Sequence, residues 1–257
     1  MPPVPNAIQL TDLTRDDLVE LYAYPVEPSA PYLRVNFVTS IDGAVTVDGR
    51  SGGLGTPADK TIFALLRDLA DVVLVGAGTV RAENYGAAHT DSALRKRLHA
   101  EGRGGDPDGT PPRIAVVSAR AALDPASKLF TDEGARPIIL TTAAASDDNK
   151  KRLIDAGAEL ILAGENLCTA QSIRAGLESL GLRRVLCEGG PSLFGELIAD
   201  RGVDDLCLTV SPQLVGGAAG RIAVYPKALP TPMVPRHLLL DTDGTILTRW
   251  ERAHTRG

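Results

Sequence analysis

Glycines and carboxylates follow three apolar segments of this 257-residue chain, in places where ligand-binding loops commonly lie. Residues 40–43 (Ser-Ile-Asp-Gly) follow the first segment, residues 76–79 (Gly-Ala-Gly-Thr) the second, and residues 188–193 (Glu-Gly-Gly-Pro-Ser-Leu) the third. Glycine lets the phosphates of a ligand approach the backbone, and free amides at a following helix N-terminus attract anions. The carboxylates of Asp42 and Glu188 are well placed there to bind a ligand.

Each of these segments also has a purely structural interpretation. Asp42-Gly43 is a common turn pair, and residues 76–79 could form an ordinary strand-to-helix turn. Arg81 stands where the dinucleotide fingerprint GxGxxG requires a small residue, so that fingerprint is not satisfied. Glu188 favours function more strongly, because a charged group is seldom kept at a buried strand end without a partner.

Short apolar segments alternate with amphipathic ones from Tyr32 onward. Predicted strands cover 33–38, 72–75, 114–117, 137–140, 159–162, 185–187 and 206–210, with two more near the C-terminus. Predicted helices begin at Pro57, cover 146–156 and 170–180, and begin again at Pro191. This alternation predicts an α/β fold with a mostly parallel mixed central sheet and helices on both faces. The three glycine corners would then meet at one edge of the sheet, where such folds bind cofactors.

The sequence predicts a single domain over residues 31–257, preceded by an N-terminal extension over residues 1–30. The extension could start a short helix at Thr11, and three prolines between residues 25 and 31 predict an extended linker after it. Residues 101–112 are rich in Gly, Asp and Pro and are predicted to form a mobile surface loop.

Composition and missing motifs argue against several classes of function. The net charge of −5 disfavours nucleic-acid binding, which needs a basic surface. The histidines are scattered without zinc-ligand spacing, and neither a nucleophile elbow nor a phosphate loop occurs, so no metal is expected. Three widely spaced cysteines, no signal-peptide pattern and no long apolar stretch predict a cytoplasmic protein without a membrane segment. Hydride transfer fits this chain, because it needs only a positioned cofactor and a shaped pocket.

Five segments, taken in order, resemble the pyrimidine reductase family of riboflavin biosynthesis, the reductase half of a bifunctional deaminase–reductase. They are Thr39–Gly43, Leu65–Asp71, Val75–Val80, Glu188–Leu193, and Val203–Leu206 followed by Ser211–Gly217. Each segment is weak alone, but five in the family's order over residues 32 to 220 make a specific signal. The deaminase motifs HxE and PCxxC are absent, which predicts a stand-alone reductase.

The resemblance implies a dihydrofolate-reductase-like fold, NADPH as hydride donor, a homodimer, and reduction of 5-amino-6-(5-phosphoribosylamino)uracil to its ribitylamino product. By family position, the residues implied to contact NADPH are Val38, Gly53, Thr79, Glu83, Ser118, Gly190, Pro191, Ser192 and Leu193. We also assign to the cofactor site the neighbouring Gly76, Gly78, Val80 and Gly189. The residues implied to contact the substrate are Ser51, Arg67 and Glu188. Asp42 and Glu188 are the predicted catalytic groups, with Asp42 as an acid/base or ribose-orienting group.

The loop after Glu83 departs from the family pattern. It reads Asn84-Tyr-Gly-Ala-Ala-His, where the family usually presents an arginine for the substrate phosphate. Arg95, Arg97 or Arg103 could substitute, and Arg120 could bind the 2′-phosphate of the cofactor. Two alternatives therefore stay open: a reductase of dihydrofolate or a related pteridine, as in similar stand-alone actinobacterial-type members, and a nucleotide-binding module without catalysis. Arg67 could also be a surface residue paired with Asp71.

Overall fold

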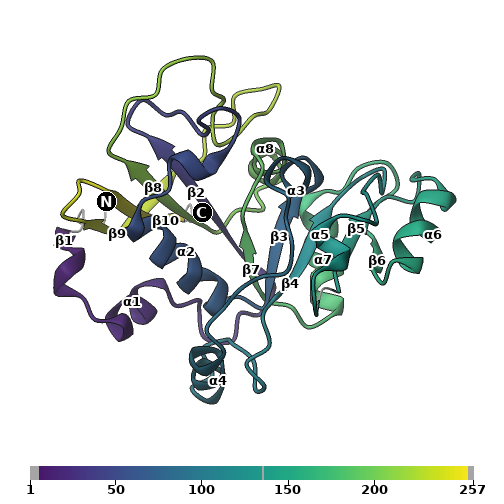
Figure 1. Cartoon of the computed structure of the whole chain (residues 1–257), viewed down its shortest axis with the longest axis horizontal. Helices are drawn as coiled ribbons and strands as arrows, with labels where there is room; N and C mark the ends of the chain where they lie inside the picture. The colour runs from purple at the N-terminus through teal and green to yellow at the C-terminus, as the bar shows by residue number, and fades with distance from the viewer. Residues whose placement is uncertain (1–5, 135, 254–257) are drawn as a thin grey trace.

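The computed structural model describes residues 6–134 and 136–253 and is built on a 10-stranded sheet (Figure 1). The strand order is β1-β9-β10-β8-β2-β7-β3-β4-β5-β6. The strands are β1 (Ala7–Gln9), β2 (Tyr32–Ser40), β3 (Val72–Gly76), β4 (Arg113–Val117), β5 (Ile138–Thr141), β6 (Glu159–Leu162), β7 (Arg184–Cys187), β8 (Asp205–Ser211), β9 (Met233–Leu240) and β10 (Ile246–Arg252). Strand β10 runs antiparallel to β8 and β9, and the other pairings are parallel. The predicted mostly parallel mixed sheet is confirmed.

Helices cover both faces of this sheet, as predicted. They are α1 (Arg15–Tyr22), α2 (Pro57–Leu69), α3 (Ala77–Glu83), α4 (Ser92–Ala100), α5 (Lys128–Thr131), α6 (Asp147–Asp155), α7 (Ala170–Ser179) and α8 (Pro191–Ala199), with 3₁₀ turns η1 (Leu10–Asp12) and η2 (Ser51–Gly53). Because successive side chains of a strand point to opposite faces, β3 serves two cores. Val73 and Val75 pack in the core formed with α1 to α6, whereas Val72 and Leu74 pack in the core formed with α7 and α8.

Helix α2 begins where the sequence predicts. The Thr56 side chain accepts a hydrogen bond from the Asp59 amide at 3.2 Å, and Pro57 occupies the first helical position. The apolar face carrying Ile62 and Leu66 is buried against the sheet. This packing fixes the rotation of α2 about its axis and so decides which of its remaining side chains reach the functional cavity described below.

The N-terminal segment packs as part of the same body. Strand β1 pairs in parallel with β9, and α1 contributes Leu18, Val19 and Tyr22 to the core. The helix that the sequence suggests from Thr11 begins at Arg15 instead. The reason is Thr14, whose side chain forms a reciprocal capping box with Asp17.

The loop over residues 101–112 lies on the surface but is tied to the core by Arg95. The buried Arg95 guanidinium donates to the backbone carbonyls of Thr110 at 2.7 Å and of Asp68 and Ala70 at 2.9 Å. A buried guanidinium must find acceptors for its donors, so these bonds hold the loop against the end of α2. Composition alone did not show this attachment. No helix among the described residues is long and apolar enough to cross a membrane.

Candidate functional site

Two of the three predicted glycine corners meet at the carboxyl ends of β3 and β7. The Gly76 amide donates to the Gly189 carbonyl at 2.7 Å. A Cβ atom on Gly190 would overlap the Thr79 hydroxyl, so glycine allows this close approach without displacement of the Thr79 side chain. Helix α8 starts directly at this corner, and its N-cap residue Gly190 provides no side-chain cap. The helix amides there are consequently free to bind an anion.

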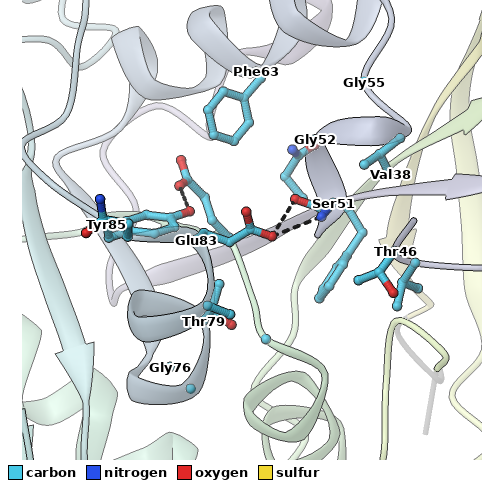
Figure 2. A pocket seen from close by; sticks show the side chains of 18 of the residues that line it. Val38, Thr46, Ser51, Gly52, Gly55, Phe63, Gly76, Thr79, Glu83 and Tyr85 are labelled. Carbon is cyan, nitrogen blue, oxygen red and sulfur yellow. Dashed lines mark hydrogen bonds between the residues drawn. The ribbon is translucent and has the colours of Figure 1, made fainter. Parts of the chain in front are cut away.

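A cavity of about 740 Å³ opens beside these corners (Figure 2). Besides the glycine corners, its walls include residues 36–38 of β2, parts of the loop over residues 45–55, the flank of α2 that carries Phe63 and Arg67, and the end of α3 with the loop that follows it. This volume falls in the range of small-molecule and cofactor sites. Among the described residues, no group of three or more His, Cys, Asp and Glu side chains is arranged to hold a metal ion.

Arg67, Glu188 and Tyr85 form a hydrogen-bonded network in the cavity wall. Arg67 donates to Glu188 through Nε at 2.7 Å and Nη2 at 2.8 Å, and the Tyr85 hydroxyl donates to Glu188 Oε2 at 2.5 Å. The guanidinium also stacks on Phe63, with 4.4 Å between its central carbon and the ring centroid. Glu188 thus has the charged partner that a buried carboxylate at a strand end requires. Arg67 pairs with Glu188 and not with Asp71, its partner in the purely structural alternative.

The network has a defined protonation pattern. Burial opposes the charged form of Arg67, but the hydrogen bond and negative charge of Glu188 outweigh it, so the pKa of Arg67 is raised. Burial, followed by the charge of Glu188, raises the pKa of the Tyr85 phenol well above its ordinary value. Tyr85 is therefore a neutral hydrogen-bond donor at physiological pH.

Glu83 and Ser51 connect the two walls of the cavity. The Glu83 carboxylate accepts hydrogen bonds from the Ser51 amide and hydroxyl, both at 3.0 Å. Figure 2 shows Glu83 between Tyr85 on one side and Ser51 on the other. Since Glu83 ends α3 and Ser51 begins η2, this contact joins segments far apart in the sequence across the cavity mouth.

Most of the predicted site residues line this cavity. They are Val38, Ser51, Arg67, Gly76, Gly78, Thr79, Glu83, Glu188, Gly190, Pro191, Ser192 and Leu193. The predicted residues Asp42, Gly53, Val80, Ser118 and Gly189 are not in its wall. Gly53 and Gly189 adjoin lining residues, Val80 is buried in the core, and Ser118 follows the end of β4.

The corner around Asp42 lies apart from the other two. The Asp42 carboxylate accepts hydrogen bonds from the Ser40 hydroxyl at 2.5 Å and from the amides of Gly216 and Val215 at 2.7 and 3.2 Å. These bonds, that of Ser40 first, lower the pKa of Asp42 to about 2. The geometry therefore gives Asp42 the task of joining two loops and does not bring its carboxylate to the cavity.

None of the three arginines suggested as a replacement phosphate ligand reaches the cavity. Arg95 is buried among backbone carbonyls, Arg97 pairs with Asp16 at 2.6 Å, and Arg103 pairs with Glu20. Their positions on and after α4 explain this, because α4 packs with α2 at a distance from the glycine corners (Figure 1).

Sequence reasoning missed Tyr85 and Phe63 as parts of the site. Phe63 lies one turn before Arg67 on α2, so the same helical flank that was assigned to substrate could have revealed it. Tyr85 belongs to the loop that was noted only for its missing arginine. Its contact with Glu188 joins positions 103 residues apart, which no local pattern encodes.

A nicotinamide dinucleotide fits the residues present at the glycine corners. A single added Cβ would fill the corner formed by Gly76, Gly190 and Thr79. The bare glycine backbone therefore lets the phosphates of a ligand come close. The uncapped amides of α8 supply donors for their charge, and Val38 offers an apolar surface in the same cavity. A bound cofactor of this kind would supply a hydride.

Comparisons with known proteins agree with this architecture. Residues 31–247 match the family described as the RibD C-terminal domain. The 2,5-diamino-6-ribosylamino-4(3H)-pyrimidinone 5′-phosphate reductases of Aquifex aeolicus and Archaeoglobus fulgidus are similar, with 31% identity over 193 residues and 28% over 188 residues. Each alignment covers 73% of this chain, and 79% and 83% of the respective relative. A solved pyrimidine reductase-like protein from Corynebacterium diphtheriae has a TM-score of 0.79 and 27% identity, over 92% of this chain and 99% of that one.

Proposed function

The chain belongs to the family of the RibD C-terminal domain, and we propose that it is an NADPH-dependent reductase of riboflavin biosynthesis that acts on a 6-(ribosylamino)pyrimidinone 5′-phosphate. The net change breaks the ribose C1′–O4′ bond: a hydride from NADPH adds at C1′ and a proton from water adds at the former ring oxygen, which yields the ribitylamino product and NADP⁺. The observation that carries this proposal is one cavity that contains both an anion-binding glycine corner and the Arg67–Glu188–Tyr85 network.

The residues divide the work between the two ligands. The corner at Thr79 and Gly190 is proposed to hold the cofactor phosphates, with Val38 near the nicotinamide. Ser51 and Arg67 with Glu188 are proposed to bind and orient the substrate opposite it. The Glu83–Ser51 contact closes the wall between them and restricts water in the cavity, which strengthens electrostatic interactions inside.

The identity of the pyrimidine ring is tested by direct comparison. The two relatives above act, by their names, on the 2,5-diamino compound, whereas the sequence resemblance implies 5-amino-6-(5-phosphoribosylamino)uracil. We expect NADPH oxidation with at least one of the two and a ribityl product by chromatography. Absence of turnover with both at saturating cofactor would contradict the proposal.

The missing phosphate arginine favours a second candidate substrate class. Arg67 is already bound to Glu188, and the other Lys and Arg side chains in the described cavity wall are Lys60 and Lys128. A dihydrofolate-like pteridine needs no phosphate ligand and could occupy the same cavity. Turnover of dihydrofolate that exceeds turnover of both pyrimidines would establish this alternative in place of the first.

We also propose that the chain forms a homodimer, as the family resemblance implies. Ile41 and Leu214 are 61% and 76% exposed, and their loops are joined by the Ile41 amide, which donates to the Gln213 carbonyl at 3.0 Å. Such an apolar surface suits an interface. Light scattering should give the mass of two chains, and Leu214→Asp should reduce it to one. A monomeric wild-type protein would rule the dimer out.

Cytoplasmic localisation stays a prediction.

A further inference from the structure

Tyr85 is directed into the cavity by the way α3 ends. Asn84 adopts a left-handed conformation with φ of 53°, so the chain reverses direction just before Tyr85. Gly86 follows, and a Cβ there would overlap the Asp132 carboxylate. The same carboxylate accepts a hydrogen bond from the Ala87 amide at 3.1 Å. The backbone is thus held on both sides of Tyr85, by the end of α3 before it and by the Asp132 contact after it. Its ring therefore has little freedom to leave Glu188.

The hydrogen bonds to Glu188 leave one acceptor position open. A carboxylate oxygen has two lone pairs, so the side chain can accept about four hydrogen bonds. Oε2 accepts from Arg67 Nη2 and from the Tyr85 hydroxyl, which occupies both of its lone pairs. Among the residues that the structure describes, Oε1 accepts only from Arg67 Nε. The remaining lone pair on Oε1 is the place where a donor from a bound ligand can be received.

We propose that Tyr85 is a positioning residue of the active site, whose phenol holds the Glu188 carboxylate so that Oε1 receives the substrate's hydrogen-bond donor. This inference rests on the proposed function, because it assigns Glu188 to the substrate. It also explains how the loop that lacks the family's arginine contributes to the site. A neutral phenol at this place orients the existing carboxylate and adds no charge of its own.

The electrostatics of the cavity suit such a fixed donor. Burial and the neighbouring Glu188 charge keep the Tyr85 phenol protonated, so it donates throughout the physiological pH range. A hydrogen bond to a charged acceptor is stronger than one between neutral groups, which gives the contact enough strength to select one carboxylate orientation. The Arg67 fork fixes the plane of the carboxylate, and the Tyr85 hydroxyl occupies the second lone pair of Oε2, which leaves Oε1 to receive the donor of the ligand.

The first test is Tyr85→Phe, which removes only the hydroxyl. We expect kcat/KM for the pyrimidine to fall about tenfold or more, since a hydrogen bond to a charged group is lost. The dissociation constant of NADPH, followed by fluorescence, should not change. Tyr24→Phe is the control, because Tyr24 is a buried tyrosine whose hydroxyl has no hydrogen-bond partner among the described residues. Wild-type kcat/KM in Tyr85→Phe would overturn the proposal.

The second test asks whether Tyr85 acts through Glu188. In a Glu188→Gln background, Tyr85→Phe should have little further effect on kcat/KM, because the carboxylate that it positions is already absent. Full additivity of the two losses would overturn the positioning role.

A third measurement does not depend on the substrate. Ultraviolet absorbance of the phenolate, taken as the difference from the Tyr85→Phe variant, should show that the pKa of Tyr85 falls in Glu188→Gln, since the negative charge that opposes ionisation is gone. An unchanged titration would refute the contact. If the wild-type protein turns over no pyrimidine but this shift is observed, the proposed function fails while the Tyr85–Glu188 coupling stands.

Discussion

Asp42 and Glu188 are both carboxylates at the ends of sheet strands, yet their surroundings give them different tasks. Glu188 is buried, faces the cavity, and shares its oxygens with Arg67 and Tyr85. Asp42 is exposed, and its oxygens are taken up by Ser40 and by the loop over residues 213–216. Both carboxylates precede a glycine at the end of a strand, but of the two only that of Glu188 lies in the cavity wall.

Substitution of the two carboxylates should separate these tasks. We expect Glu188→Gln to reduce kcat/KM by about tenfold or more, since the charged hydrogen bonds of the network are weakened. Asp42→Asn keeps the size of the side chain, so turnover should stay within the same order of magnitude. Steady-state kinetics on both variants checks this, and a larger loss in Asp42→Asn than in Glu188→Gln would restore Asp42 as a catalytic group.

Gly190 is the residue on which cofactor binding should depend most directly. In Gly190→Ala the new Cβ overlaps the Thr79 hydroxyl, which forces the Thr79 side chain out of the corner where the cofactor phosphates are proposed to bind. We expect the dissociation constant of NADPH to rise at least tenfold, measured by fluorescence titration, while the unfolding midpoint changes little. Gly220→Ala is the control, because a Cβ on Gly220 meets nothing within 4 Å. Equal NADPH affinity in both variants would show that the cofactor does not use this corner.

At the scale of whole elements, the strands and helices that can be predicted from the sequence are those whose hydrophobic pattern or start signal lies within their own segment. Strands β3 and β7 are uninterrupted apolar runs because both of their faces are buried, and α2 carries its own start signal in Thr56-Pro57. Strand β1 has only three residues and no such pattern, since its pairing with β9 comes from tertiary contact. The Tyr85–Glu188 and Asp42–Gly216 contacts escaped prediction for the same reason.

The turn after β4 should decide between NADPH and NADH. Arg81 of α3 donates to the Ala122 carbonyl at 3.4 Å, and Asn149 of α6 donates to the Arg120 carbonyl at 3.0 Å, so two helices hold this turn beside Ser118. This turn follows β4, which pairs in parallel with β3, so it lies at the same edge of the sheet as the glycine corner after β3. Arginine forks suit a 2′-phosphate, so we expect Arg81 and Arg120 to favour NADPH.

Replacement of these arginines tests that preference. In Arg81→Ala and Arg120→Ala, the ratio of NADPH to NADH affinity should fall about tenfold per lost charged contact, with NADH binding unchanged. Calorimetric titration with each cofactor measures the ratio directly. Arg136→Ala, at the amino end of β5, removes an exposed arginine far from this edge and serves as the control. An unaltered ratio in both test variants would place the 2′-phosphate elsewhere.

At the scale of the whole molecule, a buried ionic cluster joins helix α1 to strands β2, β8 and β10 of the sheet. Asp205 of β8 accepts from Arg34 Nε of β2 and from Arg249 Nε of β10, both at 2.9 Å. Arg34 and Arg249 also donate to the carbonyls of Tyr22 and Leu21 at 2.5 and 2.6 Å at the end of α1. Loss of one member would leave an uncompensated buried charge, which costs about 3–5 kcal/mol.

His237 of β9 makes this cluster a determinant of acid stability. It is 3% exposed, packs edge-to-face on Tyr22 with 4.7 Å between ring centroids, and is faced by Arg249, Arg34 and Asp205. Burial, followed by the positive charge of Arg249, lowers the pKa of His237 from 6.5 to about 4. The unfolded chain therefore binds more protons than the folded one between these two pH values, so stability must fall as the pH decreases through that window.

The loss over this window should be about 3 kcal/mol, from 1.36 kcal/mol for each pKa unit. Urea unfolding of the wild-type protein from pH 7 to pH 4 should show this decline. In His237→Phe the aromatic contact with Tyr22 is retained and the titrating group is gone, so the decline should be smaller. His99→Gln removes an exposed histidine and should follow the wild-type curve. Parallel curves for His237→Phe and wild type would mean that the loss of stability at low pH comes from protonation of groups other than His237.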